Sequence, residues 1–209
     1  MKIFDTEGPV FQFLSKVCDI VIINLLFVLC CLPVFTIGAS ISAMNYSTQS
    51  MIYDRGGGIA KTFFKGFKDN FKQSTLYFIP ALLIMASLVY EYIFLVPQAG
   101  VSGQFSGVLI FFLMILLVCF SAYIFQLLVR YRNSLKNHIK NGVLLTFGKL
   151  PRTIMLFFFN TLPLILFLLF PVQFVKSSLF WVIVGFALMS FLSSRTLKPV
   201  FQEIEAVEK

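Results

Sequence analysis

Long runs of apolar residues constrain this chain more than any other feature of its sequence. Residues 105–129 contain no formally charged side chain, and four other stretches carry at most one each. A helix needs about 20 largely apolar residues to cross the hydrocarbon core of a bilayer. We therefore predict an all-α fold, a polytopic transmembrane helical bundle forming one domain over residues 1–209, with spans at about 17–38, 75–96, 105–129, 153–171 and 177–194.

The composition indicates that lipid surrounds much of the protein. Hydrophobic residues make up 58% of the chain and charged residues only 12%, whereas about a quarter of the residues of a soluble domain are charged. A folded domain of this size exposes too much surface to be covered by so few charges. The excess apolar surface must face lipid, which excludes a soluble enzyme.

Basic residues are concentrated in two connections. The formal net charge is +8, and most of the 17 Lys and Arg residues lie in the loops from Arg55 to Lys72 and from Arg130 to Arg152. Loops rich in Lys and Arg stay in the cytoplasm, so five spans place these loops and the C-terminus inside and the N-terminus outside. Short basic runs beside apolar spans are typical of contact with a lipid bilayer of anionic head groups, not with nucleic acid.

One segment leaves the number of crossings open. Residues 41–52 could return into the membrane, which would make six spans and place both termini in the cytoplasm. The segment includes Asn45, Thr48 and Gln49, whose side chains are costly in hydrocarbon unless they find partners. We therefore predict five spans, with six as the alternative.

A break in the helix is expected at the end of the first span. Pro33 lacks the backbone N–H that a helix interior requires, and Gly38 tolerates unusual backbone angles. We therefore predict that the segment from Leu32 to Ala39 bends or unwinds near one face of the membrane.

Two basic segments, at about 59–73 and 134–149, show the periodicity of amphipathic helices. In the first, Phe63, Phe67 and Phe71 recur at every fourth position and lysines form a second stripe. We predict an interfacial elbow helix with its aromatic side chains among the lipid chains. It either only leads into the next span or contacts lipid or a cytoplasmic partner, and the candidate contact residues are Lys61, Lys65, Lys68 and Lys72.

Polar residues inside apolar runs are candidate functional residues, because they are costly in lipid unless paired or hydrated. Asp19 and Glu91 are expected near the outer ends of their helices. There they either pair with a nearby lysine or form a proton- or ligand-linked pair. Asn24, Gln126 and Asn160 are expected to form hydrogen bonds between helices.

Motifs of catalysis are missing from the sequence. It contains no paired carboxylates at acid–base spacing, no Ser/His/Asp set and no glycine loop of the phosphate-binding kind. Cys18, Cys30, Cys31 and Cys119 lie within apolar runs, which argues against a disulfide framework or a metal site. We expect no enzyme activity, no cofactor and no bound metal.

Several segments in the first third of the chain carry a family resemblance. They are Asn24-Leu25-Leu26, Cys31-Leu32-Pro33-Val34, Thr36-Ile37-Gly38-Ala39-Ser40 and the run FFKGFKDNFKQ at residues 63–73. In these segments the chain resembles the YesL family of Gram-positive bacterial membrane proteins. Over the rest of the chain only the arrangement of spans and basic segments is similar.

The resemblance implies a role in sugar uptake, because members of the YesL family are usually encoded beside carbohydrate ABC importers and glycan-degrading enzymes. We expect an accessory membrane protein that binds the permease of such an importer. The alternative is an autonomous small transporter or channel, for which Asn24, Gln126, Asn160 and the two carboxylates would line only a sparse polar path. A homo-oligomer is compatible with either expectation.

Overall fold

The computed structural model describes residues 9–98 and 100–207, and all regular secondary structure in these residues is helical. Its longer helices are α1 (Pro9–Cys30), α2 (Ile37–Ile52), α3 (Ile59–Tyr90), α4 (Gly100–Arg130), α5 (Leu135–Gly148), α6 (Leu150–Leu169) and α9 (Phe186–Val207). Short turns of helix connect them: η1 (Val34–Thr36), η2 (Glu91–Leu95), η3 (Val96–Gln98), α7 (Pro171–Lys176), α8 (Ser178–Phe180) and η4 (Trp181–Gly185).

Five helical segments are long and apolar enough to cross a membrane. They are Val10–Cys30, Ile59–Gln98, Gly103–Arg130, Leu150–Leu169 and Ser178–Ala206. The predicted all-α fold with about five candidate spans is therefore confirmed.

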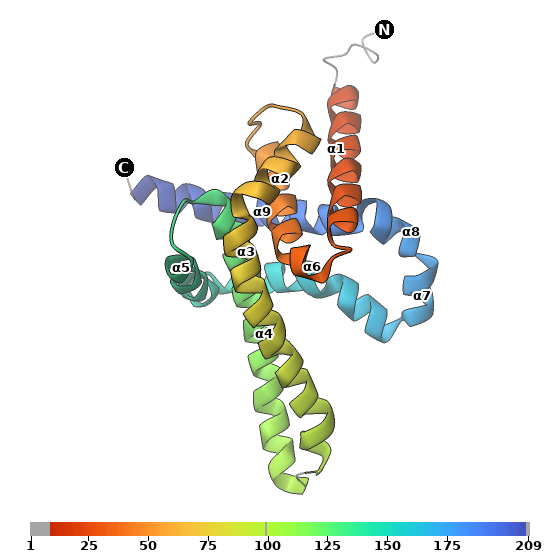
Figure 1. Ribbon diagram of the computed structural model, residues 1–209, viewed down its shortest axis with the longest axis vertical. Helices are drawn as coiled ribbons and strands as arrows, with labels where there is room; N and C mark the ends of the chain where they lie inside the picture. Colours follow the sequence, from red (N-terminus) through yellow and green to blue (C-terminus); the bar gives the residue numbers. More distant parts are fainter. Residues whose placement is uncertain (1–8, 99, 208–209) are drawn as a thin grey trace.

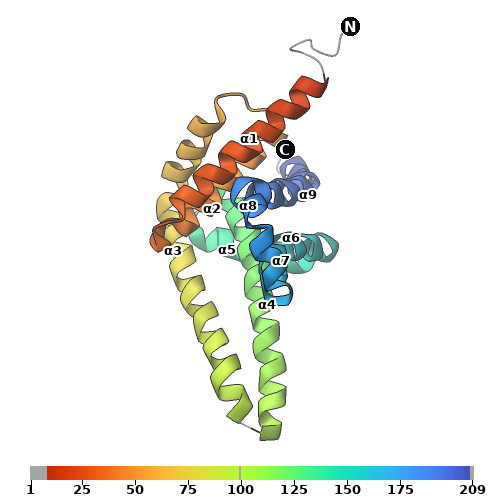
Figure 2. The same ribbon diagram turned by 90° about the vertical axis from the view of Figure 1, so that its right-hand side faces the viewer.

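The molecule consists of a helical body and a long hairpin. α3 and α4 lie side by side and project well beyond the other helices, while α6 and α9 run across the base of this hairpin (Figures 1 and 2). α2 lies at the centre of the body, where it packs against α1, α3, α4 and α9. The hairpin base and α2 therefore hold the remaining helices together.

The break after the first span is a connection between two helices, not a kink within one. α1 ends at Cys30, and the chain reverses through η1 before α2 begins. The Thr36 hydroxyl lies 2.6 Å from the carbonyl oxygens of both Cys30 and Pro33, to which it donates. The first of these bonds occupies a carbonyl oxygen that the end of α1 leaves free, and the Pro33 oxygen also accepts from the backbone N–H of Thr36 at 3.1 Å. The predicted span over 17–38 therefore includes this turn and the start of α2.

The basic segment at 59–73 is helical, but it is continuous with the following span as part of α3. Phe63 and Phe67 of its aromatic stripe pack against other helices, which corrects their predicted position among the lipid chains. Phe63 is fully buried in a cluster with Ile20, Ile23 and Met44, and Phe67 packs against that cluster. Burial of a phenylalanine side chain contributes about 1.5–3 kcal/mol, so this stripe stabilises the fold.

Glycines allow α2 and α3 to approach closely. Gly38 of α2 packs on Phe78 and on the backbone of Ser74, and Gly66 of α3 packs on the side chain of Tyr46. Small residues permit such close contact between membrane helices. Gly38 therefore allows close packing of α2 on α3. Its backbone freedom is not what breaks the helix between Leu32 and Ala39.

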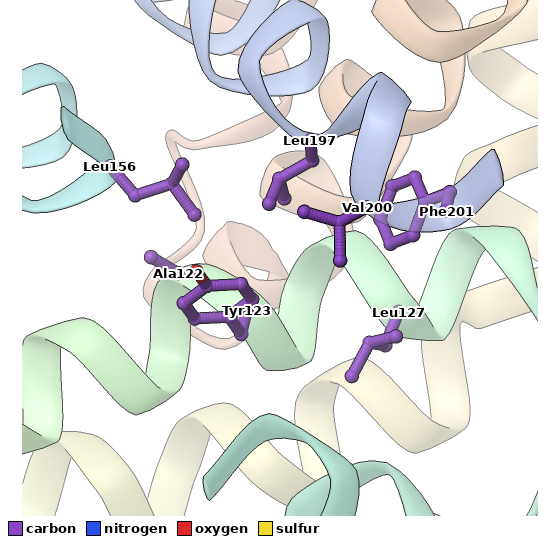
Figure 3. Packing of buried hydrophobic residues seen from close by; sticks show 7 residues of the cluster. All are labelled: Ala122, Tyr123, Leu127, Leu156, Leu197, Val200 and Phe201. Carbon is purple, nitrogen blue, oxygen red and sulfur yellow. The ribbon is translucent and has the colours of Figure 1, made fainter. Parts of the chain in front are cut away.

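A second cluster fixes α6 and α9 against α4 (Figure 3). Ala122, Tyr123 and Leu127 of α4 face Leu156 of α6 and three residues of α9, Leu197, Val200 and Phe201. Tyr123, Leu156, Leu197, Val200 and Phe201 are fully buried. This cluster holds the two crossing helices on the base of the hairpin.

Substitution Gly38→Ala should destabilise the protein. A methyl group at this position would lie 2.5 Å from Cβ of Phe78 and 2.8 Å from the Ser74 carbonyl oxygen. Overpacking of this kind costs about 1–3 kcal/mol, so the Tm of detergent-purified protein should fall by about 3–10 °C. Gly148→Ala is the control, because nothing lies within 4 Å of the added methyl group. Equal Tm values for the two variants would contradict the close packing.

Candidate functional site

The most polar part of the buried interior is one face of α2. Asn45, Thr48 and Gln49 are spaced three and four residues apart, so they lie together on a helix, and each is at most 6% exposed. They face Gln126 of α4 and the serines of α9. Because α2 is enclosed by other helices, its polar side chains have only protein partners.

Gln126 is the centre of this polar network. Nε2 of Gln49 donates to Oε1 of Gln126 at 2.7 Å and to its backbone oxygen at 3.1 Å. Nε2 of Gln126 in turn donates to Oδ1 of Asn45 at 3.3 Å. One side chain of α4 is thereby joined to two positions of α2.

Two serines of α9 complete the network. Ser190 donates to Oδ1 of Asn45 at 2.7 Å, and Ser194 donates to Oε1 of Gln126 at 3.1 Å. The Thr48 hydroxyl lies 3.1 Å from the hydroxyls of both serines. Oε1 of Gln49 is buried without a partner. The network therefore joins α2, α4 and α9 and leaves one acceptor unsatisfied.

Asn24 has a separate role, at the π-helical turn η4. Its Nδ2 donates to the carbonyl oxygens of Trp181 at 2.9 Å and Val182 at 2.6 Å, and its Oδ1 accepts from the backbone N–H of Ala187 at 2.8 Å. A π-turn disrupts the regular α-helical hydrogen bonds. The amide of Asn24 supplies partners for the backbone groups of this turn, so it anchors α1 to the start of α9.

Asn160 lies at the edge of the network. Its Nδ2 donates to the Leu156 carbonyl oxygen at 2.8 Å and to the Ser193 hydroxyl at 3.4 Å. With Asn45, Gln126 and Ser121 it lines a mostly apolar groove of about 240 Å³ between α3 and α4. The three predicted amides thus belong to the helix interfaces, and Asn160 approaches Gln126 only through this groove.

The two intramembrane carboxylates do not form a pair. Asp19 lines a cavity of about 550 Å³ with Lys16, Asp54 and Arg55. Glu91 begins η2 at the far end of the hairpin (Figure 1). The sequence predicts both carboxylates at the outer ends of their helices, and the structure instead separates them, with Asp19 on α1 in the body and Glu91 on the outer hairpin.

Cations surround Tyr53 at the end of α2. The guanidinium carbon of Arg130 lies 3.9 Å from the centre of the Tyr53 ring, and Arg55 and Lys198 lie 5.5 and 5.4 Å from it. Arg130 also forms a 2.6 Å ion pair with Glu205. Burial raises the pKa of the Tyr53 hydroxyl, although the charge of Arg130 opposes this shift. Cations favour this position because a helix C-terminus carries partial negative charge.

The four lysines of the predicted contact stripe are all exposed on α3. Lys65 and Lys72 line a cavity of about 830 Å³, and Lys61 lines an adjoining one of about 500 Å³ with Lys65. Lys68 lines neither of these cavities. The structure therefore separates Lys68 from the other three.

The buried network contains only uncharged amides and hydroxyls. Such groups donate and accept hydrogen bonds but do not exchange protons near neutral pH. Within residues 9–98 and 100–207, no three His, Cys, Asp or Glu side chains are close enough together to hold a metal ion. The chemistry that this arrangement offers is hydrogen bonding and, at the basic end, attraction of anions.

Sequence reasoning found Gln126 but missed its partners. In the sequence, Asn45, Thr48 and Gln49 argue against a membrane helix, and nothing marks Ser190 and Ser194 as hydrogen-bond partners of Gln126 or Asn45. The helical spacing of the three α2 residues was the available signal, since it predicts a single polar face.

These features define the class of protein: a polytopic helical membrane protein whose central helix is polar and enclosed. Residues 20–92 match the model of a family described as a protein of unknown function, DUF624. The matched segment contains α2, α3 and the second half of α1, and it excludes α4 and α9, which supply the other half of the network. No curated protein and no solved structure matched the chain.

Substitution Gln126→Leu should destabilise the protein. It removes the acceptor of Gln49 and Ser194 and the donor to Asn45, and each buried polar group left without a partner costs about 1–3 kcal/mol. The Tm in mild detergent should therefore fall by at least about 3 °C. Gln104→Leu is the matched control, because Gln104 is exposed on the same helix. A Tm for Gln126→Leu at or above that of the control would refute a stabilising network.

Proposed function

We propose that this protein is an accessory membrane protein of carbohydrate uptake, which binds the permease of a sugar ABC importer and has no catalytic activity of its own. The link to sugar uptake rests on the resemblance of residues 10–75 to the YesL family. The match of residues 20–92 to a family of unknown function is compatible with it. The structural feature that best supports permease binding is the outer part of the α3–α4 hairpin.

The outer hairpin is apolar and separate from the body of the protein. Large apolar side chains from Leu82 to Leu113 are exposed on both arms, and none of the most apolar stretch of α3 is buried. The arms pack on each other through Gly107, which contacts Val96. Both views show this end projecting away from the other helices (Figures 1 and 2). Its outer face is available for close packing against another membrane protein.

The hydrogen bonds of the buried network favour this proposal over an autonomous transporter. A solute path requires polar groups that are free to bind the solute. Most side-chain polar atoms of Asn45, Gln49, Gln126 and the two α9 serines are instead bonded to one another. The network is therefore better suited to holding helices together than to conducting a sugar.

The structure also supports a topology in which both ends of the chain lie in the cytoplasm. Lys16 of α1 shares one cavity with Asp54 and Arg55, and another with Arg195 and Lys198. α2 thus returns the chain to the end at which α1 starts. If α2 is counted as a sixth crossing, every Lys and Arg except Lys176 falls in a cytoplasmic segment, which fits the positive-inside rule better than five crossings do. We propose this arrangement in place of an outer N-terminus.

Purification in mild detergent followed by mass spectrometry tests the permease proposal. The wild-type protein should recover subunits of a sugar importer. A double substitution on the hairpin, Leu83→Ala with Leu109→Ala, should lower that recovery at least about fivefold, since hot-spot truncation costs about 1 kcal/mol or more per residue. The matched control is Leu164→Ala with Leu168→Ala on α6, because all four leucines are 57–66% exposed. Wild-type preparations without importer subunits, or equal losses in both variants, would reject the proposal.

Labelling of single cysteines tests the topology. In a variant without the four native cysteines, Gln12→Cys and Lys65→Cys should both resist a membrane-impermeant maleimide in intact cells and react after lysis. Gln98→Cys, at the hairpin end, should react in intact cells. If Gln12→Cys reacts in intact cells while Lys65→Cys does not, the five-span topology with an outer N-terminus is correct instead.

A further inference from the structure

The basic end of the molecule contains a cavity with a strong excess of positive charge. Its volume is about 830 Å³, and it lies between the loop after α2, the first half of α3 and the connection from α4 to α5. Asp69 is the one acidic residue among those that line it. The cationic lining residues, which define the basic cavity, are Arg55, Lys65, Lys72, Arg130 and Arg132.

Most of these cations lack a carboxylate partner. The ion pairs formed among the described residues are Arg130 with Glu205 and Lys149 with Glu203. Arg130, with 6% of its side chain exposed, also has a buried Nη1 atom without a hydrogen-bond acceptor. Like charges that share a cavity repel one another, and a bound anion relieves this repulsion.

The walls of the basic cavity are fixed by contacts within the protein. Nε2 of Gln73 donates to the backbone oxygen of Asn133 at 3.1 Å, which joins α3 to the connection after α4. Tyr46 is held against Gly66 of α3. Because opposite walls are joined in this way, the segments that carry the cations are held in place before any ligand arrives, which lowers the entropic cost of binding.

We propose that the basic cavity binds a phosphate-bearing anion. Arg side chains present a planar fork that matches phosphate oxygens, and Lys side chains add compact charge. An anionic phospholipid head group and a soluble phosphorylated compound both have this chemistry. The inference is independent of permease binding, because it uses residues at the opposite end of the molecule from the outer hairpin.

The test compares two double variants that remove the same charge from exposed lysines. Lys65→Gln with Lys72→Gln alters the basic cavity, and Lys68→Gln with Lys136→Gln alters lysines outside it. One arm uses full-length protein in phosphatidylcholine nanodiscs with added phosphatidylglycerol, and native mass spectrometry counts the retained phosphatidylglycerol. The other arm titrates inorganic phosphate against the Tm of the protein in neutral detergent, with chloride at equal ionic strength as reference.

The wild-type protein should bind the probe of at least one arm, and which arm responds identifies the source of the phosphate. The cavity variant should bind about 30-fold more weakly, which corresponds to about 1 kcal/mol for each lysine. The control variant should stay within about threefold of wild type, and both variants should keep the Tm of the unliganded protein. The inference is overturned by a wild type that binds neither probe, by a cavity variant that binds as wild type does, or by equal losses in the two variants.

Discussion

The rest of the structure depends on the enclosure of α2. This 16-residue helix carries ten buried residues, among them Asn45, Thr48 and Gln49. Lipid has no hydrogen-bonding groups to offer such side chains, so protein must surround α2 on every polar side. Gln126 and the α9 serines provide the required partners. The positions of α4 and α9 in the body follow from this requirement, and the apolar clusters then fix α6 and the base of the hairpin.

Two further features follow from packing helices around a polar centre. Close approach of α3 to α2 requires small residues, and Gly38 and Gly66 supply them. The turn η4, just before α9, is π-helical, and Asn24 of α1 forms hydrogen bonds with backbone groups at this turn. Because α1, α9 and the base of the hairpin already pack against α2, the outer part of the hairpin lies outside the body. Its apolar surface is left for lipid or for another membrane protein.

The sequence predicts the helical spans well because length and apolarity are local properties. It predicts tertiary partners poorly. A polar residue in an apolar segment looks energetically unfavourable in the membrane until its hydrogen-bond partner is known. Asn45 and Gln49 make residues 41–52 look unsuited to the membrane, whereas Gln126, distant in sequence, forms a hydrogen bond with each of them. The spacing of Phe63 and Phe67 correctly predicts an amphipathic helix. Periodicity alone, however, does not tell whether the apolar face of that helix packs against lipid or against the protein core.

The polar face of α2 also constrains how the protein is made. A translocon passes segments into lipid according to their apolarity, and α2 emerges from the ribosome before its partners do. Until Gln126 of α4 is synthesised, Asn45 and Gln49 have no acceptor or donor from that helix, and the serines of α9 come last of all. The buried polar face of α2 therefore gains its last hydrogen-bond partners only when the final helix of the protein has been made.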